Sequence, residues 1–237
     1  MAIRPFLAMT AAEIHRTLVF PPDIAWMACH FSPYGIGLSN LPQSLPPNSI
    51  LIVDDITPIR GHDPKIILQQ LAQCAENVSC NGILLDFQRP GIPDITRLVE
   101  ILTADLPCPV GVSHLYAEPG SFPVFLPPVP PSVPPEEHFR QWPDRELWLE
   151  LALDAVEIRV TENGSVFTPL PFQRNQEKGF ESEDLCCHYN CQQDEDQIKF
   201  TLWRTEGDIE ALLEQAEKFG VTTAVGLYQE FSQLNVK

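Results

Sequence analysis

Basic residues are scarce in this sequence. Lys and Arg together number 15 against 32 Asp and Glu, which gives a formal net charge of −17. A field of that sign repels phosphate backbones and anionic lipid surfaces. Nucleic acid and membranes are therefore not expected as partners, and solubility alone accounts for the acidity without any ligand.

Long apolar runs are also lacking. No stretch approaches 18 uninterrupted apolar residues, and residues 1–10 do not show the basic start and apolar run that mark a secretory signal. We therefore expect a soluble, cytoplasmic protein. The seven cysteines are an odd count, and four of them lie within or beside apolar segments, where Cys behaves as a small buried hydrophobe: Cys29, Cys74, Cys80 and Cys108. This usage fits a reducing compartment.

Several motifs of site chemistry are missing as well. The sequence has no Gly-rich phosphate loop, no Gly-x-Ser-x-Gly elbow and no visible internal repeat. The segment from Cys186 to Cys191 contains the residue types that bind zinc. Neighbouring residues in a strand point to opposite faces, however, so Cys186 and Cys187 could not hold one ion. We expect no metal and no cofactor.

The sequence has the length and the element order of an α/β barrel. Its 237 residues are close to the roughly 250 that such a barrel needs, and 44% hydrophobic residues allow a large core. Short apolar runs alternate with helical patterns in the first half, which favours a parallel sheet. We predict a (β/α)8 TIM-type barrel in one domain, residues 1–237, with strands at Ile3–Ala8, Ile24–His30, Ser49–Asp54, Gly82–Phe87 and Pro109–Ser113.

Local capping signals predict the helices. Asp63 followed by Pro64 is a helix start, because Asp caps the first turn and Pro suits its first position. Thr10 and Thr205 each precede an acidic residue three positions later, which is the pattern of a capping box. The predicted helices cover residues 10–17, begin near 64 and near 93, and cover 205–219, followed by a last strand, Val221–Tyr228.

The middle third is irregular. Residues 118–143 contain nine prolines, which remove the backbone donors that a regular element needs, so an extended loop should replace at least one barrel helix. Phe122–Leu126 is interpreted as an edge or barrel strand, and Leu147–Asp154 as either a short helix or a strand. Asn163-Gly164 predicts a hairpin of Ala155–Val160 with Val166–Leu170, and a second hairpin is expected between Leu185–Gln192 and Ile198–Trp203.

Polar residues follow several of the predicted barrel strands. In a parallel barrel the βα loops converge at the carboxyl ends of the strands, and the chemistry sits there. The candidate site residues are His30, Asp54, Asp55, Asp86, Gln88, His114, Tyr116, Tyr228 and Glu230. Asp54 and Asp55 have a structural alternative as turn caps, and His30 as a hydrogen-bonded core histidine. Asp86 follows a strand expected to be buried on both faces, where a carboxylate needs partners, and this favours a functional role.

The segment from Asn81 to Gln88 resembles the family 18 glycoside hydrolase motif, Asp-Gly-x-Asp-x-Asp-x-Glu. Gly82 and Asp86 match, whereas Asn81 and Leu84 replace the first two acids, and Gln88 stands where the family places its proton-donating Glu. The segment falls on the fourth predicted strand, which is where the family carries the motif.

Two further segments resemble the same family. Residues 198–228 are similar to the close of its spore-type branch, with a strand ending at Trp203, an amphipathic helix, a Gly-Val step and a last strand ending at an aromatic. Residues 30–38, with Tyr34, resemble the loop after the second strand. The likeness spans most of the chain and fails through the Pro-rich middle.

The resemblance implies a site that faces sugars but lacks its acid. In the family, the Glu protonates the leaving oxygen while the substrate's N-acetyl group attacks, assisted by the neighbouring Asp. Gln88 cannot donate that proton. Our first hypothesis is a degenerate cleft that binds oligosaccharides with N-acetylated sugars, with Asp54, Asp86 and Gln88 as polar contacts and with aromatic platforms at Tyr34, Trp203 and Tyr228.

Two alternatives remain. The protein could be an active glycoside hydrolase that uses another mouth carboxylate, with Asp55, Asp86 and Glu230 as the candidates. It could instead be a non-catalytic protein that binds a protein partner through the Pro-rich loop, because Pro127–Pro131 has the composition of a polyproline II ligand.

Overall fold

A computed structural model describes residues 3, 5–17, 19–117, 120–171 and 179–232. Eight parallel strands form a closed barrel, because the last strand pairs back to the first. In order around the barrel they are β1 (Pro5–Met9), β2 (Ile24–Phe31), β4 (Ile50–Asp54), β5 (Gly82–Asp86), β6 (Val110–Ser113), β7 (Val124–Leu126), β8 (Leu147–Leu151) and β14 (Val221–Leu227). The predicted (β/α)8 fold is confirmed.

The helices lie between the strands, with gaps. They are α1 (Ala11–Arg16), α2 (Pro64–Asn77), α3 (Pro93–Asp105), the 3₁₀ turn η1 (His114–Tyr116), α4 (Pro135–Phe139), α5 (Glu206–Glu217) and α6 (Tyr228–Phe231). Capping boxes open α1 and α5, and Asp63 caps α2, as their sequences predict. Residues 32–49, between β2 and β4, contain the short antiparallel strand β3 (Leu38–Ser39) in place of a helix. No helix in the described ranges is both long and apolar enough to cross a membrane.

The Pro-rich segment contributes one barrel strand and one short helix. β7 pairs with β6 and β8, so the segment predicted as an edge or barrel strand is a barrel strand. The only helix among the described residues of 118–143 is α4, with five residues. The expectation of an ordered loop without a complete barrel helix is therefore confirmed for those residues.

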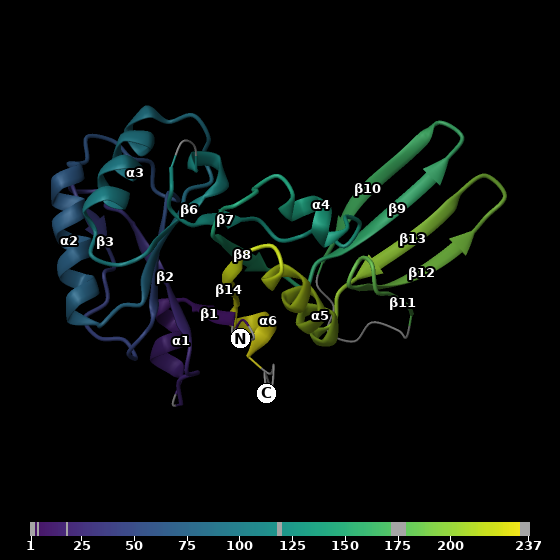
Figure 1. The fold of residues 1–237 in the computed structure, drawn as a ribbon, viewed down its shortest axis with the longest axis horizontal. Helices are drawn as coiled ribbons and strands as arrows, with labels where there is room; N and C mark the ends of the chain where they lie inside the picture. The colour runs from purple at the N-terminus through teal and green to yellow at the C-terminus, as the bar shows by residue number, and fades with distance from the viewer. Residues whose placement is uncertain (1–2, 4, 18, 118–119, 172–178, 233–237) are drawn as a thin grey trace.

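An antiparallel sheet of five strands is inserted between β8 and α5. Its strands are β9 (Ala155–Thr161), β10 (Gly164–Leu170), β11 (Phe180–Ser182), β12 (Cys187–Gln193) and β13 (Ile198–Trp203). Both predicted hairpins are present in it. Figure 1 shows this sheet projecting from the side of the barrel opposite α2 and α3. β13 is thus a strand of the insertion, whereas the resemblance made it part of the barrel's close.

Apolar residues fill the inside of the barrel, and Trp148 is the largest of them. The inner cluster consists of Phe6, Ala8, Ala25, Ile50, Ile52, Leu84, Phe125, Trp148 and Val225. The ring lies against two strand positions that have no side chain. A Cβ at Gly82 would lie 2.9 Å from Trp148, and one at Gly111 would collide with it. Glycine at these positions therefore gives the indole its space.

Candidate functional site at the barrel mouth

Three neighbouring strands bring polar residues together at the barrel mouth. The parallel register pairs His30 with Asp54, and Asp54 with Asp86. Ile52 and Leu84, two residues before the carboxylates, belong to the inner cluster. Because side chains two apart in a strand share a face, Asp54 and Asp86 point into the mouth.

The alignment of residues 81–88 with the family motif requires that Leu85 and Phe87, which flank Asp86, face away from the mouth. Leu85 and Phe87 face outward and are buried under the helices. The Gln88 amide donates a hydrogen bond to the Asp86 carboxylate, so these two side chains meet. Burial raises the pKa of Asp86, and the nearby charges of Asp54 and Asp55 add to this, whereas the hydrogen bond from Gln88 opposes it.

Asp55 holds the loop that carries Gln88. It is 4% exposed, and its two carboxylate oxygens accept the backbone N–H groups of Gln88 and Arg89, each at 3.0 Å. Both oxygens are therefore engaged in fixing the backbone after β5. This geometry makes Asp55 a positioning residue and disfavours it as a general acid.

Tyr116 supports the same loop from the other side. It is 7% exposed, its hydroxyl donates to the carbonyl of Arg89, and it accepts the N–H of Ile92 at 3.2 Å. Its ring contacts Phe87 edge-on, with centroids 6.2 Å apart. The expectation that Tyr116 contacts substrate directly is corrected, because its ring and hydroxyl are used inside the protein.

Glu150 is a mouth carboxylate that the sequence does not reveal. It follows the inward-facing Trp148 by two residues on β8, so it points to the same side at the end of the seventh strand. Burial raises the pKa of Glu150 to about 7, and the charges of Asp86, Asp154 and Glu230 add to the effect. Glu150 can therefore hold a proton near neutral pH, beside the carboxylate of Asp86.

The strand assignment explains why Glu150 is absent from the predicted site. The sequence of residues 147–154 fits either a short helix or a strand, and the two interpretations place a lone acidic residue on different faces. Only the alternation of a strand aligns Glu150 with Trp148. The signal is the run Leu147-Trp148-Leu149-Glu150-Leu151, in which the leucines pack outward.

The remaining polar candidates lie around this centre. Glu230, on α6, accepts the backbone N–H of Leu153 at 3.0 Å, so one of its oxygens joins α6 to the end of β8. His30 Nδ1 lies 3.1 Å from the carbonyl oxygen of Ala28. His114 begins η1 after β6, and burial lowers its pKa. Tyr228 begins α6 after β14 and is partly exposed.

The expected aromatic platforms differ in exposure. Tyr34 is 98% exposed in the loop after β2 and can offer its ring to a ligand. Trp203 is 4% exposed and stacks on His188, with centroids 6.0 Å apart. The prediction for Trp203 was wrong, because β13 belongs to the inserted sheet and buries the indole there.

A buried arginine fastens the Pro-rich loop. Arg204 is 4% exposed and donates to the carbonyls of Val129 and Pro130 in the loop, and to those of Leu185 and Cys186 before β12. Val129 is itself buried. The segment is thus held as part of the protein, which favours the structural alternative over a freely presented polyproline ligand.

Comparison with known proteins identifies the fold. No family model matches the sequence, and no curated protein matches it. The chitinase-like agglutinin RobpsCRA from Robinia pseudoacacia superposes with a TM-score of 0.57 at 10% identity, over 93% of each chain. The spore cortex-lytic enzyme SleL from Bacillus cereus superposes with a TM-score of 0.52 at 10% identity, over 94% of this chain and 70% of that chain. The chain therefore shares its (β/α)8 barrel fold with these two proteins.

Proposed function

We propose that the barrel mouth binds an oligosaccharide with N-acetylated sugars and that it lacks chitinase-type turnover. The observation that carries the proposal is the pair at the end of β5, in which the Gln88 amide donates to Asp86 at the motif's acid position. Asp86 keeps the place of the residue that assists the N-acetyl group, while the proton donor is replaced.

The expected loss of catalytic rate follows from the chemistry of Gln88. A general acid contributes typically about 10²- to 10⁴-fold to rate, and an amide has no proton to give in that role. The same amide can still donate a hydrogen bond to a sugar oxygen. The site is therefore suited to binding a substrate-like ligand without cleaving it by the route of the resembled family.

The other mouth groups support binding. Sugar sites combine aromatic faces with a few directed hydrogen bonds. Asp54, Asp86 and His30 form a row of polar groups across three strands, and the exposed ring of Tyr34 lies on the loop after β2. One protein with this fold is named a chitinase-like agglutinin. The name describes that protein by agglutination, and this supports a binding role for the fold.

A hydrolysis assay on oligomers of N-acetylglucosamine tests the proposal. The unmodified protein should show no cleavage, and Gln88→Glu should show a measurable gain, because it restores a titratable proton beside Asp86. Gln192→Glu is the matched control: it makes the same amide-to-acid change at an exposed position of β12, in the inserted sheet, and it should remain inactive. Robust cleavage by the unmodified protein would contradict the proposal.

A second candidate function, slow glycoside hydrolysis, is favoured by Glu150. Its pKa of about 7 is suitable for a general acid at neutral pH, and the mouth carboxylate of Asp86 lies near enough for its charge to act on Glu150. Cleavage by the unmodified protein that falls as pH rises through about 7 and is abolished by Glu150→Gln would establish this alternative. Cleavage that survives Glu150→Gln would exclude Glu150 as the general acid.

A further inference from the structure

Two cysteines from different loops meet at the amino-terminal end of the barrel, away from the mouth. Cys80 lies two residues before β5, and Cys108 lies two residues before β6. These strands are parallel neighbours, with Ile83 opposite Val110. Neighbouring strands run about 4.8 Å apart, and a disulfide spans Cα separations of about 4.4 to 6.8 Å. The register therefore brings the two cysteines within disulfide reach.

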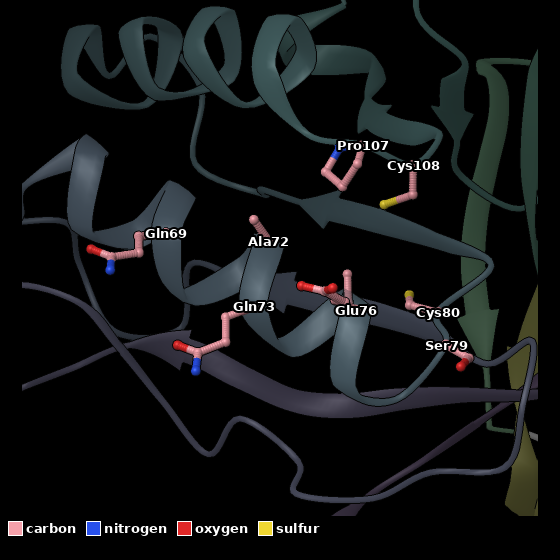
Figure 2. A pocket seen from close by; sticks show the side chains of 9 residues that line it. Gln69, Ala72, Gln73, Glu76, Ser79, Cys80, Pro107 and Cys108 are labelled. Atoms are coloured by element: carbon pink, nitrogen blue, oxygen red, sulfur yellow. The ribbon is translucent and has the colours of Figure 1, made fainter.

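The two thiols are neighbours and are accessible. Their side chains lie near enough for each to shift the pKa of the other. Both are partly exposed, and both line an open cavity of about 850 Å³ beside the last turns of α2. Figure 2 shows the two cysteines close together at one end of this cavity. A small oxidant can reach the pair without unfolding the barrel.

The two thiols differ in acidity. The neighbouring Cys108 side chain lowers the pKa of Cys80, although burial opposes this. The neighbouring Cys80 side chain, together with burial, raises the pKa of Cys108. Because the thiolate is the reactive form of cysteine, Cys80 is the residue that attacks first. In the reduced form the Cys80 thiol donates to the carbonyl of Gly82 at 2.8 Å. Cys74 differs from Cys80 in being buried, and its thiol donates to the carbonyl of Pro42.

We propose that Cys80 and Cys108 form a redox site that closes to a disulfide when the protein meets a peroxide. The Cys80 sulfur attacks the O–O bond of hydrogen peroxide, one oxygen stays on sulfur as a sulfenic acid, and the other leaves as water. The Cys108 thiol then attacks that sulfur, the S–S bond forms, and a second water leaves. Two thiols and one peroxide thus give one disulfide and two waters, and a dithiol reductant reverses the change.

The disulfide would join two neighbouring strands whose other ends carry mouth residues. It closes the loop that contains β5 and α3, and a cross-link of this kind restricts the unfolded chain. For a protein of this size we expect the melting midpoint to rise by about 5 °C or more on oxidation. The proposal is independent of what the mouth binds.

The test is to oxidise the purified protein with hydrogen peroxide and map its disulfides by mass spectrometry. Trypsin separates the two cysteines into the peptides 66–97 and 98–140, because Pro90 protects the bond after Arg89. We expect these peptides to be joined after peroxide treatment and separated by dithiothreitol. Cys80→Ser and Cys108→Ser should each abolish the joined species and the rise in melting midpoint.

Two matched controls make the result specific. Cys74 shares a tryptic peptide with Cys80, so Cys74→Ser must keep the joined species. Cys191→Ser, which removes the exposed thiol on β12, must also keep it. The proposal is overturned if peroxide oxidises Cys191 while peptides 66–97 and 98–140 stay separate, or if the joined species persists in Cys80→Ser. Disulfide mapping of the unmodified protein tests the proposed Cys80–Cys108 disulfide even if a Ser variant folds poorly.

Discussion

Replacing Glu150 with Gln should change how the stability of the protein depends on pH. The pKa of Glu150 is raised from 4.5 to about 7 by burial and by the neighbouring carboxylates. Between these two values the folded protein holds the proton more tightly than the unfolded chain does. Stability therefore falls as pH rises from about 4.5 to 7 and stays low above 7.

The size of the effect follows from the shift. One pKa unit corresponds to about 1.4 kcal/mol, so the free energy of unfolding should fall by about 2 to 3 kcal/mol across this range, allowing for partial solvation of the side chain. In Glu150→Gln the amide has no proton to lose. The stability of Glu150→Gln relative to the unmodified protein should thus increase with pH by the same amount.

Urea unfolding at pH 5, 6, 7 and 8 measures this difference. The free energy of unfolding of Glu150→Gln minus that of the unmodified protein should be about 2 to 3 kcal/mol larger at pH 8 than at pH 5. Glu162→Gln, at an exposed hairpin turn, should give a difference that does not change with pH. If the difference for Glu150→Gln is equally flat, Glu150 is not the buried, charge-crowded carboxyl described above.

Three further substitutions test the framework of the site, each by urea unfolding. Gly111→Ala should lower the free energy of unfolding by about 1 to 3 kcal/mol, because the added methyl group collides with Trp148. Adding Trp148→Phe should recover part of this loss. If Gly111→Ala is as stable as the unmodified protein, the close approach of Trp148 to Gly111 is refuted. Arg204→Ala should cost about 3 kcal/mol or more, because it leaves the buried carbonyls of the Pro-rich loop unpaired, and an unchanged midpoint would show that the loop does not depend on it. Asp55→Asn should cost about 1 to 3 kcal/mol, since its amide can accept only one of the two backbone N–H groups; a neutral result would remove its role in holding Gln88.

The sequence is most informative where local rules and burial agree. Thr10, Asp63 and Thr205 start helices as their capping patterns predict, because a cap depends only on neighbouring backbone groups. Gly82–Asp86 is a strand buried on both faces, so its apolar run and its alternation lead to one register. That register is enough to predict the direction of Asp86.

The sequence is least informative where long-range pairing decides. Residues 147–151 fit a short helix or a strand, and only pairing with β7 and β14 makes them the seventh barrel strand. Glu150 is missed for that reason. Trp203 is misplaced because a strand followed by a helix has the same pattern inside an insertion as in a barrel. Its burial depends on the sheet that β13 forms with β9 and β12. The pairing of β13 with β9 joins the two hairpins, and the local patterns predict these hairpins only separately.

The most direct test of the central claim is calorimetric titration of the protein with the tetramer of N-acetylglucosamine. We predict saturable binding, weakened about 10-fold or more by Asp86→Asn, which removes a charged hydrogen-bonding group from the mouth. Asp94→Asn, a matched change at an exposed position in the first turn of α3, should leave the affinity unchanged. Absence of saturable heat, or equal affinity in Asp86→Asn, would contradict a carbohydrate site at the barrel mouth.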